Sequence, residues 1–113
     1  MGQTLPQVPV DDLRARIDAD PVLVSDAQLQ VYIGIGERLA GAELAPDGDF
    51  TTHTNVAEAI AQLAVKVWDL RPRGVVDLDM AGDLSPAMPA TRGLVLSVRG
   101  LLLPSMATGG LTV

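Results

Sequence analysis

One stretch of the sequence constrains the fold more than any other, because its side chains recur at the spacing of an α-helix. Positions i, i+3, i+4, i+7, i+8 and i+11 are Ile60, Leu63, Ala64, Val67, Trp68 and Arg71. A helix places such positions on one face. Asn55 and Glu58 form a cap pair and Pro72 is a stop signal, so we expect a helix over residues 55–71. We interpret Trp68 as a core anchor, with a partner-facing position as the alternative.

A second helix is predicted over residues 25–42. Ser25 followed by Gln28 is the pattern of a capping box, which satisfies two backbone N–H groups at a helix start. Gly34 and Gly36 lie inside this segment and each lowers helix propensity by about 1 kcal/mol relative to Ala. We therefore expect a neighbouring helix to approach closely at both glycines.

Two weaker helices are predicted near the ends of the chain. The first covers residues 10–19 and ends before Pro21, since the residue preceding a proline disfavours helix. The last covers residues 91–103, capped by Thr91 and ended by Pro104, and a strand remains the alternative there.

Composition agrees with a single all-α domain over residues 1–113, a small bundle of about four helices. Apolar residues make up 48% of the chain but aromatic residues only 3%, which favours helix packing over an aromatic-rich sandwich. The net charge of -6 opposes a role in gripping nucleic acid. The residues expected to hold the bundle together are Leu29, Ile33, Ile60, Ala64, Val67, Trp68, Val98 and Leu102.

Three segments lie outside the predicted helices. Residues 1–9 are expected to form an extended, mobile leader, with order beginning near Asp11. Residues 73–90 form a long loop without helical periodicity, and residues 104–113 a short tail. Loops of this length usually bind a partner or stay disordered, and the alternation over residues 76–80 suits a short strand that pairs with a partner's edge.

Half of the eight basic residues of this acidic sequence follow position 70, namely Arg71, Arg73, Arg92 and Arg99. Two interpretations stay open: helix-end compensation and ordinary surface ion pairs, or charge pairing across a protein interface. The residues we predict to contact partners are Arg71, Arg73, Val76, Leu78, Met80, Arg92, Leu111 and Val113.

The sequence offers little catalytic chemistry. It contains no Cys and a single His, His53, which we expect to face solvent in a turn. One imidazole without a second ligand is not a metal site, and no serine lies in a nucleophile elbow. We therefore expect neither enzyme activity nor a metal or cofactor. An enzyme subunit that uses His53 as an acid or base is the weakest alternative. No apolar stretch approaches the roughly 20 residues of a membrane span.

The order of segments resembles the tailed-phage head-to-tail connector family, the adaptor or head-completion proteins that join a portal ring to the tail. The resemblance covers most of the chain and is carried by residues 12–18 (DLRARID), 26–33 (DAQLQVYI) and 57–69 (AEAIAQLAVKVWD). The chain departs from the family pattern in its long acidic loop after Arg73 and in the two glycines of its last helix.

The resemblance implies a helical bundle that forms a ring, commonly of twelve copies, beneath the portal of a virion. It also implies contacts with neighbouring copies, with the portal protein and with a tail-side stopper or tail component. DNA would pass through the channel without sequence-specific binding, which suits an acidic chain. The alternative is a small helical interaction or regulatory module that acts as a dimer.

Overall fold

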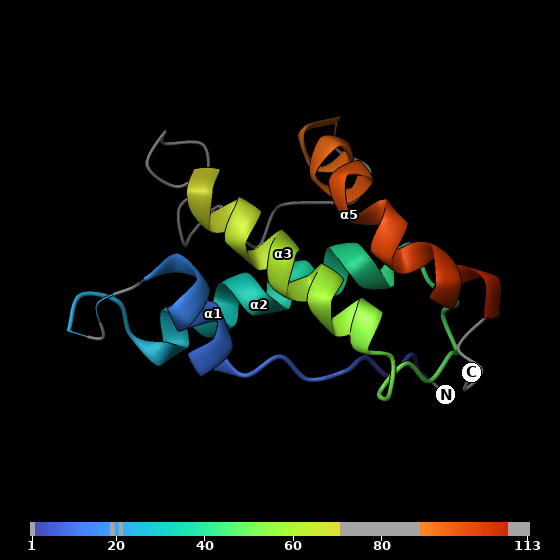
Figure 1. Ribbon diagram of the computed structural model, residues 1–113, viewed down its shortest axis with the longest axis horizontal. Coiled ribbons are helices and arrows are strands. Elements are labelled where there is room, and N and C mark those ends of the chain that lie inside the picture. The colour runs from blue at the N-terminus through green and yellow to red at the C-terminus, as the bar shows by residue number, and fades with distance from the viewer. Residues whose placement is uncertain (1, 19, 21, 71–88, 109–113) are drawn as a thin grey trace.

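The computed structural model describes residues 2–18, 20, 22–70 and 89–108, and these fold as an all-α bundle, as predicted. The helices in those ranges are α1 (Val10–Ile17), α2 (Asp26–Gly41), α3 (Thr54–Leu70) and α5 (Pro89–Thr108) (Figure 1). Residues 91–103 are therefore helical, which removes the strand alternative. Among the described residues the only β-type pairing is an isolated bridge between Thr4 and Asp49.

Helix α3 is the centre of the bundle. It contacts α1, α2 and α5, most extensively α2, and Figure 1 shows it between α5 on one side and α1 and α2 on the other. Seven of the eight predicted core residues are buried, and the eighth, Trp68, is half-buried against that core. The Trp68 ring meets Tyr32 edge-on, with centroids 5.5 Å apart and planes at 80°. This geometry is favourable for aromatic pairs and supports the core-anchor interpretation of Trp68.

The two glycines of α2 differ from each other. A Cβ at Gly36 would lie 2.6 Å from the Ile60 carbonyl oxygen, so the close approach expected there is confirmed. Gly34 is exposed and has nothing within 4 Å of a Cβ position, so the same prediction is wrong for Gly34. The difference arises because Gly36 belongs to the inward-facing apolar stripe of α2, whereas Gly34 lies on the outer face of the helix.

The ends of α1 and α3 differ from the predicted bounds. Helix α1 ends at Ile17, because Asp18 adopts the left-handed conformation (φ 52°) that closes a helix. Helix α3 starts at Thr54, so Asn55 lies within it and the predicted cap pair is wrong. The side chain of Asn55 reaches α5 instead, and Glu58 pairs with Arg16 of α1.

Helix α5 is longer than predicted at both ends. It begins at Pro89, so Thr91 lies inside it, and it continues through Pro104 to Thr108. Pro104 has no backbone N–H, so the helical hydrogen bond to the Gly100 carbonyl is missing. Gly100 has no side chain, so none crowds the helix where this bond is lost. Burial of Leu102 and Ser105 on either side of the proline keeps the helix on the bundle. Residues 104–108 are thus helix rather than tail.

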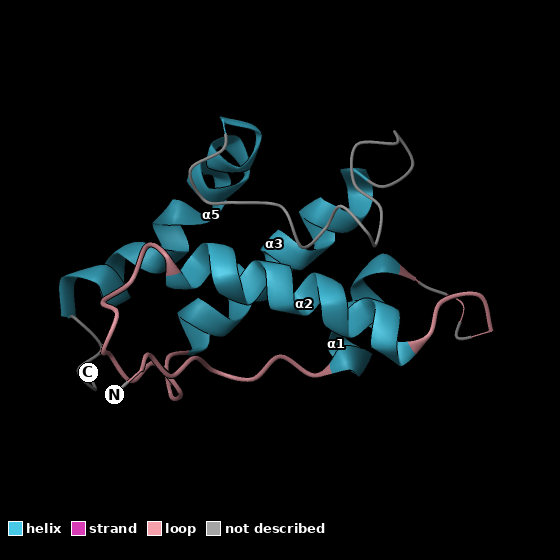
Figure 2. Ribbon diagram, turned by 180° about the vertical axis from the view of Figure 1, so that it is seen from behind, coloured by secondary structure: helices cyan, strands magenta, loops and turns pink. Residues whose placement is uncertain are grey.

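The leader is extended as expected, but its contacts with the bundle begin at Gln3 rather than near Asp11. The Thr4 N–H donates to the Gly48 carbonyl (3.0 Å) and the Phe50 N–H donates to the Thr4 carbonyl (2.8 Å). Val8 is buried in the core. Figure 2 shows this segment running along the helices towards the α2–α3 loop. The sequence signal for mobility was misleading because the hydrogen-bond partners come from a distant loop.

Most of the predicted partner-contacting segments lie outside the described residues. This applies to residues 71–88 and 109–113, including the proposed short strand at 76–80. Within the described part of the chain, no helix combines the length and the apolarity needed to cross a membrane.

Candidate functional site

The buried polar residues join the start of α3 to the end of α5. His53 Nδ1 lies 2.6 Å from Ser105 Oγ, and Asn55 Nδ2 donates to Ser105 Oγ (2.9 Å) and to the Leu101 carbonyl (2.7 Å). His53 is only 8% exposed, so the prediction that it faces solvent is wrong. Its ring packs edge-on against Phe50, with centroids 5.3 Å apart. Sequence reasoning missed this cluster because its partners lie about 50 positions apart.

A serine hydroxyl beside an imidazole is also the arrangement of a nucleophile and its base. Here Ser105 is 1% exposed and its Oγ already accepts the Asn55 amide, so the hydroxyl is enclosed by the bundle. His53 Nε2 is buried without a hydrogen-bond partner among the described residues. We interpret the cluster as a clamp that holds α5 on α3.

A second polar cluster joins α1 to α3. The Arg16 guanidinium donates to both Glu58 carboxylate oxygens at 2.8 Å, and its Nε lies 3.3 Å from Asp12. Gln62 Nε2 donates to Glu58 at 3.0 Å. Because of the Arg16 hydrogen bonds, the pKa of Glu58 is lowered to about 2, and the pKa of Arg16 is raised.

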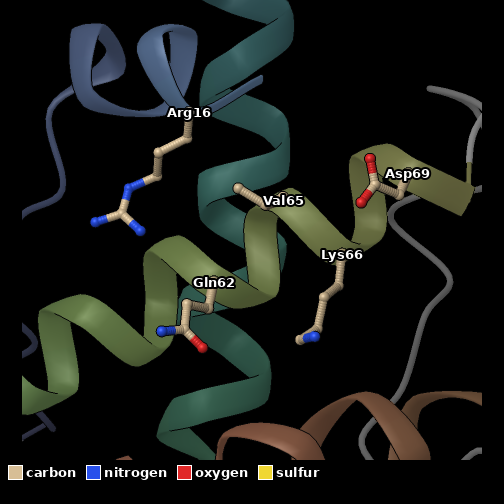
Figure 3. Close-up of a pocket in the computed structure, with 5 residues that line it drawn as sticks. All are labelled: Arg16, Gln62, Val65, Lys66 and Asp69. Carbon is tan, nitrogen blue, oxygen red and sulfur yellow. The ribbon is translucent and has the colours of Figure 1, made fainter. Parts of the chain in front are cut away.

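Beside this ion pair lies a shallow hollow of about 330 Å³ (Figure 3). It is lined by Arg16, Gln62, Val65, Lys66 and Asp69. In Figure 3 the Arg16 side chain comes from α1 and the other four from α3, and the five do not converge on one point. The charges are mixed, and no group of three metal-ligating residues occurs in the described part of the chain. The hollow therefore lacks the convergent polar groups of a small-molecule site.

The outward side of α5 carries apolar residues that the rest of the described chain leaves exposed. We define the α5 outer face as Gly93, Leu96, Gly100 and Leu103, which follow one another at helical spacing opposite the buried face of α5. Leu96 is 55% exposed and Leu103 51%, and among the described residues neither glycine has an atom from outside its own helix turn within 4 Å of a Cβ position. The face therefore combines two exposed leucines with gaps that an incoming side chain can enter.

A second exposed apolar site lies between α1 and α2. We define the α1–α2 tip as Asp20, Val22 and Leu23. Val22 is 88% exposed and Leu23 77%, the highest values among the large hydrophobic residues of the described chain. The Asp20 carboxylate accepts the Val22 N–H at 2.9 Å, which shapes the turn.

Of the predicted partner-contacting residues, only Arg92 is described. Its guanidinium pairs with Glu43 at 2.6 Å within the chain, which is the ordinary surface ion pair considered from the sequence. The other seven, Arg71, Arg73, Val76, Leu78, Met80, Leu111 and Val113, lie outside the described residues. The α5 outer face was not predicted from the sequence.

No family model, curated protein or solved structure matches this chain.

Proposed function

We propose that this protein is a structural head-to-tail connector of a tailed phage, placed as a ring between the portal and the tail. The observation that carries the proposal is the α5 outer face, an apolar helix surface whose leucines are both more than half exposed in the described part of the chain. Exposed apolar patches on small proteins usually mark contact surfaces. A protein that works by contact needs such surfaces rather than a cleft with convergent polar groups.

Three further features support this role. The bundle is small and helical, as the resemblance to the connector family implies. The chain has a net charge of -6, which weakens attraction to DNA passing through a channel. Ser105 and Glu58 form internal clamps, Ser105 between α3 and α5 and Glu58 between α1 and α3.

The direct test is binding to portal rings. The purified chain is mixed with rings assembled from the portal protein of the same genome, and the mixture is imaged by electron microscopy. We expect one added layer of protein on a single face of the ring. A genome without a portal protein, or rings that stay bare at saturating concentration, would overturn the proposal.

A matched pair of variants separates the α5 outer face from general surface effects. Leu96→Ser with Leu103→Ser changes the exposed leucines of α5, and Val31→Ser changes an exposed apolar residue of α2. We expect the α5 variant to reduce the added layer and the Val31 variant to retain it. A stable dimer in light scattering that ignores portal rings would instead favour the alternative, a dimeric interaction module.

A further inference from the structure

We infer that the α5 outer face is the seat for the α1–α2 tip of a second copy of this chain. This contact rests on the proposed function in one respect: it would form the interface between neighbouring copies in the ring.

The two surfaces are complementary in shape. The tip projects two neighbouring aliphatic side chains, Val22 and Leu23, which are the most exposed large hydrophobic residues described. The α5 outer face offers gaps at Gly93 and Gly100, where no other described part of the chain lies within 4 Å of a Cβ position. A branched side chain placed at such a gap reaches the helix backbone while touching the flanking leucine, which removes apolar area of both copies from water.

Their charges are also complementary. Helix α5 contains Arg92 and Arg99 but no acidic residue, in a chain whose net charge is -6. Arg92 pairs with Glu43, whereas Arg99 has no ion-pair partner among the described residues and lies beside Leu96 and Leu103 on the helix. At the tip, Asp20 is exposed and likewise has no cationic partner among the residues described. The acidic α1–α2 tip would therefore meet a helix that carries basic residues and no acidic ones.

The placement of the surfaces excludes a contact within one molecule. Figure 1 shows the α1–α2 tip at one end of the long axis and α5 towards the other, and the molecule extends 40 Å along that axis. The tip of one copy can therefore reach only the α5 of another. Two different surfaces meeting in this way make a head-to-tail contact, which repeats from copy to copy and closes into a ring or continues as a filament.

Disulfide trapping tests this contact, because the natural chain contains no Cys. Leu23→Cys is prepared with an affinity tag, and Leu96→Cys and Leu103→Cys without one. The tagged and untagged variants are mixed and oxidised, and the products are separated by mass. A disulfide forms only where Cα atoms come within about 7 Å, so trapping reports a specific contact. The control is Val31→Cys, which places a thiol at an exposed apolar site of α2.

We expect a mixed dimer of Leu23→Cys with at least one α5 variant, at a yield at least fivefold above that of Val31→Cys with the same variant. No mixed dimer, an equal yield with Val31→Cys, or a dimer of Leu96→Cys alone that exceeds the mixed product would overturn the inference. Circular dichroism of each variant checks the fold. Trapping without a layer on portal rings would refute the connector role alone, and a layer without trapping would refute this contact alone.

Discussion

Replacing Gly36 by alanine tests the packing of the bundle directly. Gly36 lies on the inner face of α2, where α2 makes the most extensive helix contact of the fold with α3. The added methyl group would lie 2.6 Å from the Ile60 carbonyl oxygen and 3.4 Å from the Ala64 nitrogen. Both are backbone atoms, so neither can rotate away as the end of a flexible side chain would. The two helices must move apart to accept the change.

The magnitude follows from two opposing effects. Optimal contact between heavy atoms lies near 3.5 Å, so the methyl is about 1 Å too close to the Ile60 oxygen. Overpacking of this kind costs about 1–3 kcal/mol, and a rigid backbone neighbour places the cost near the upper end. Alanine returns about 1 kcal/mol of helix propensity, which leaves a net loss of about 2 kcal/mol. For 113 residues this lowers Tm by about 8 °C.

Gly34→Ala is the matched control, two positions away on the same helix. Its added methyl meets nothing within 4 Å, so only the propensity effect of about 1 kcal/mol remains. We expect Tm to rise by about 4 °C. Both variants are measured by thermal unfolding followed by circular dichroism, with urea titration at 25 °C as a second measure. A Gly36→Ala variant as stable as Gly34→Ala would refute the close approach of α2 to α3.

Three further predictions concern the clamps and the leader. Glu58 contributes stability above its ordinary pKa near 4.5 that is lost as the pH falls towards its folded pKa of about 2. Because the Glu58 side chain is 39% exposed, we expect this contribution to the free energy of unfolding to be only about 1 kcal/mol. Glu58→Gln should remove this pH dependence in urea titrations between pH 6 and pH 2.5. Ser105→Ala should cost about 1–3 kcal/mol in the same assay, since it leaves Nδ1 of the buried His53 without its hydrogen-bond partner, whereas the exposed Ser97→Ala should change stability by less than about 0.5 kcal/mol. Val8→Ala should cost about 2 kcal/mol if the leader is part of the core, and no change in Tm would contradict that packing.

Local signals predicted the helices well because the information lies in neighbouring residues. The Ser25–Gln28 capping box is present in both directions: the Gln28 N–H donates to Ser25 Oγ and the Ser25 N–H donates to Gln28 Oε1. Proline was a less reliable signal. Pro104 was expected to end α5, but burial of Leu102 and Ser105 outweighs the one hydrogen bond that the proline removes.

The candidate contact surfaces were harder to predict than the helices. A leucine-rich helix has more apolar residues than its inner face requires, and periodicity alone assigns only the best stripe to the core. Leu96 and Leu103 became recognisable as a surface only once the opposite side of α5 was seen buried on α3. Val22 and Leu23 carry no periodic signal, and their exposure follows from the turn that joins α1 to α2.

The amino-acid sequence by itself determined the helical class, the number of helices described and most of the core, because amphipathic spacing and caps act over one or two turns. The tertiary structure decided the placement of His53, the anchoring of the leader and the uncovered side of α5. Each of these depends on groups about 40 to 50 positions apart, such as Thr4 with Phe50 or His53 with Ser105. Such pairs leave no local pattern, since they form only when packing of the helices brings distant backbone and side-chain groups together.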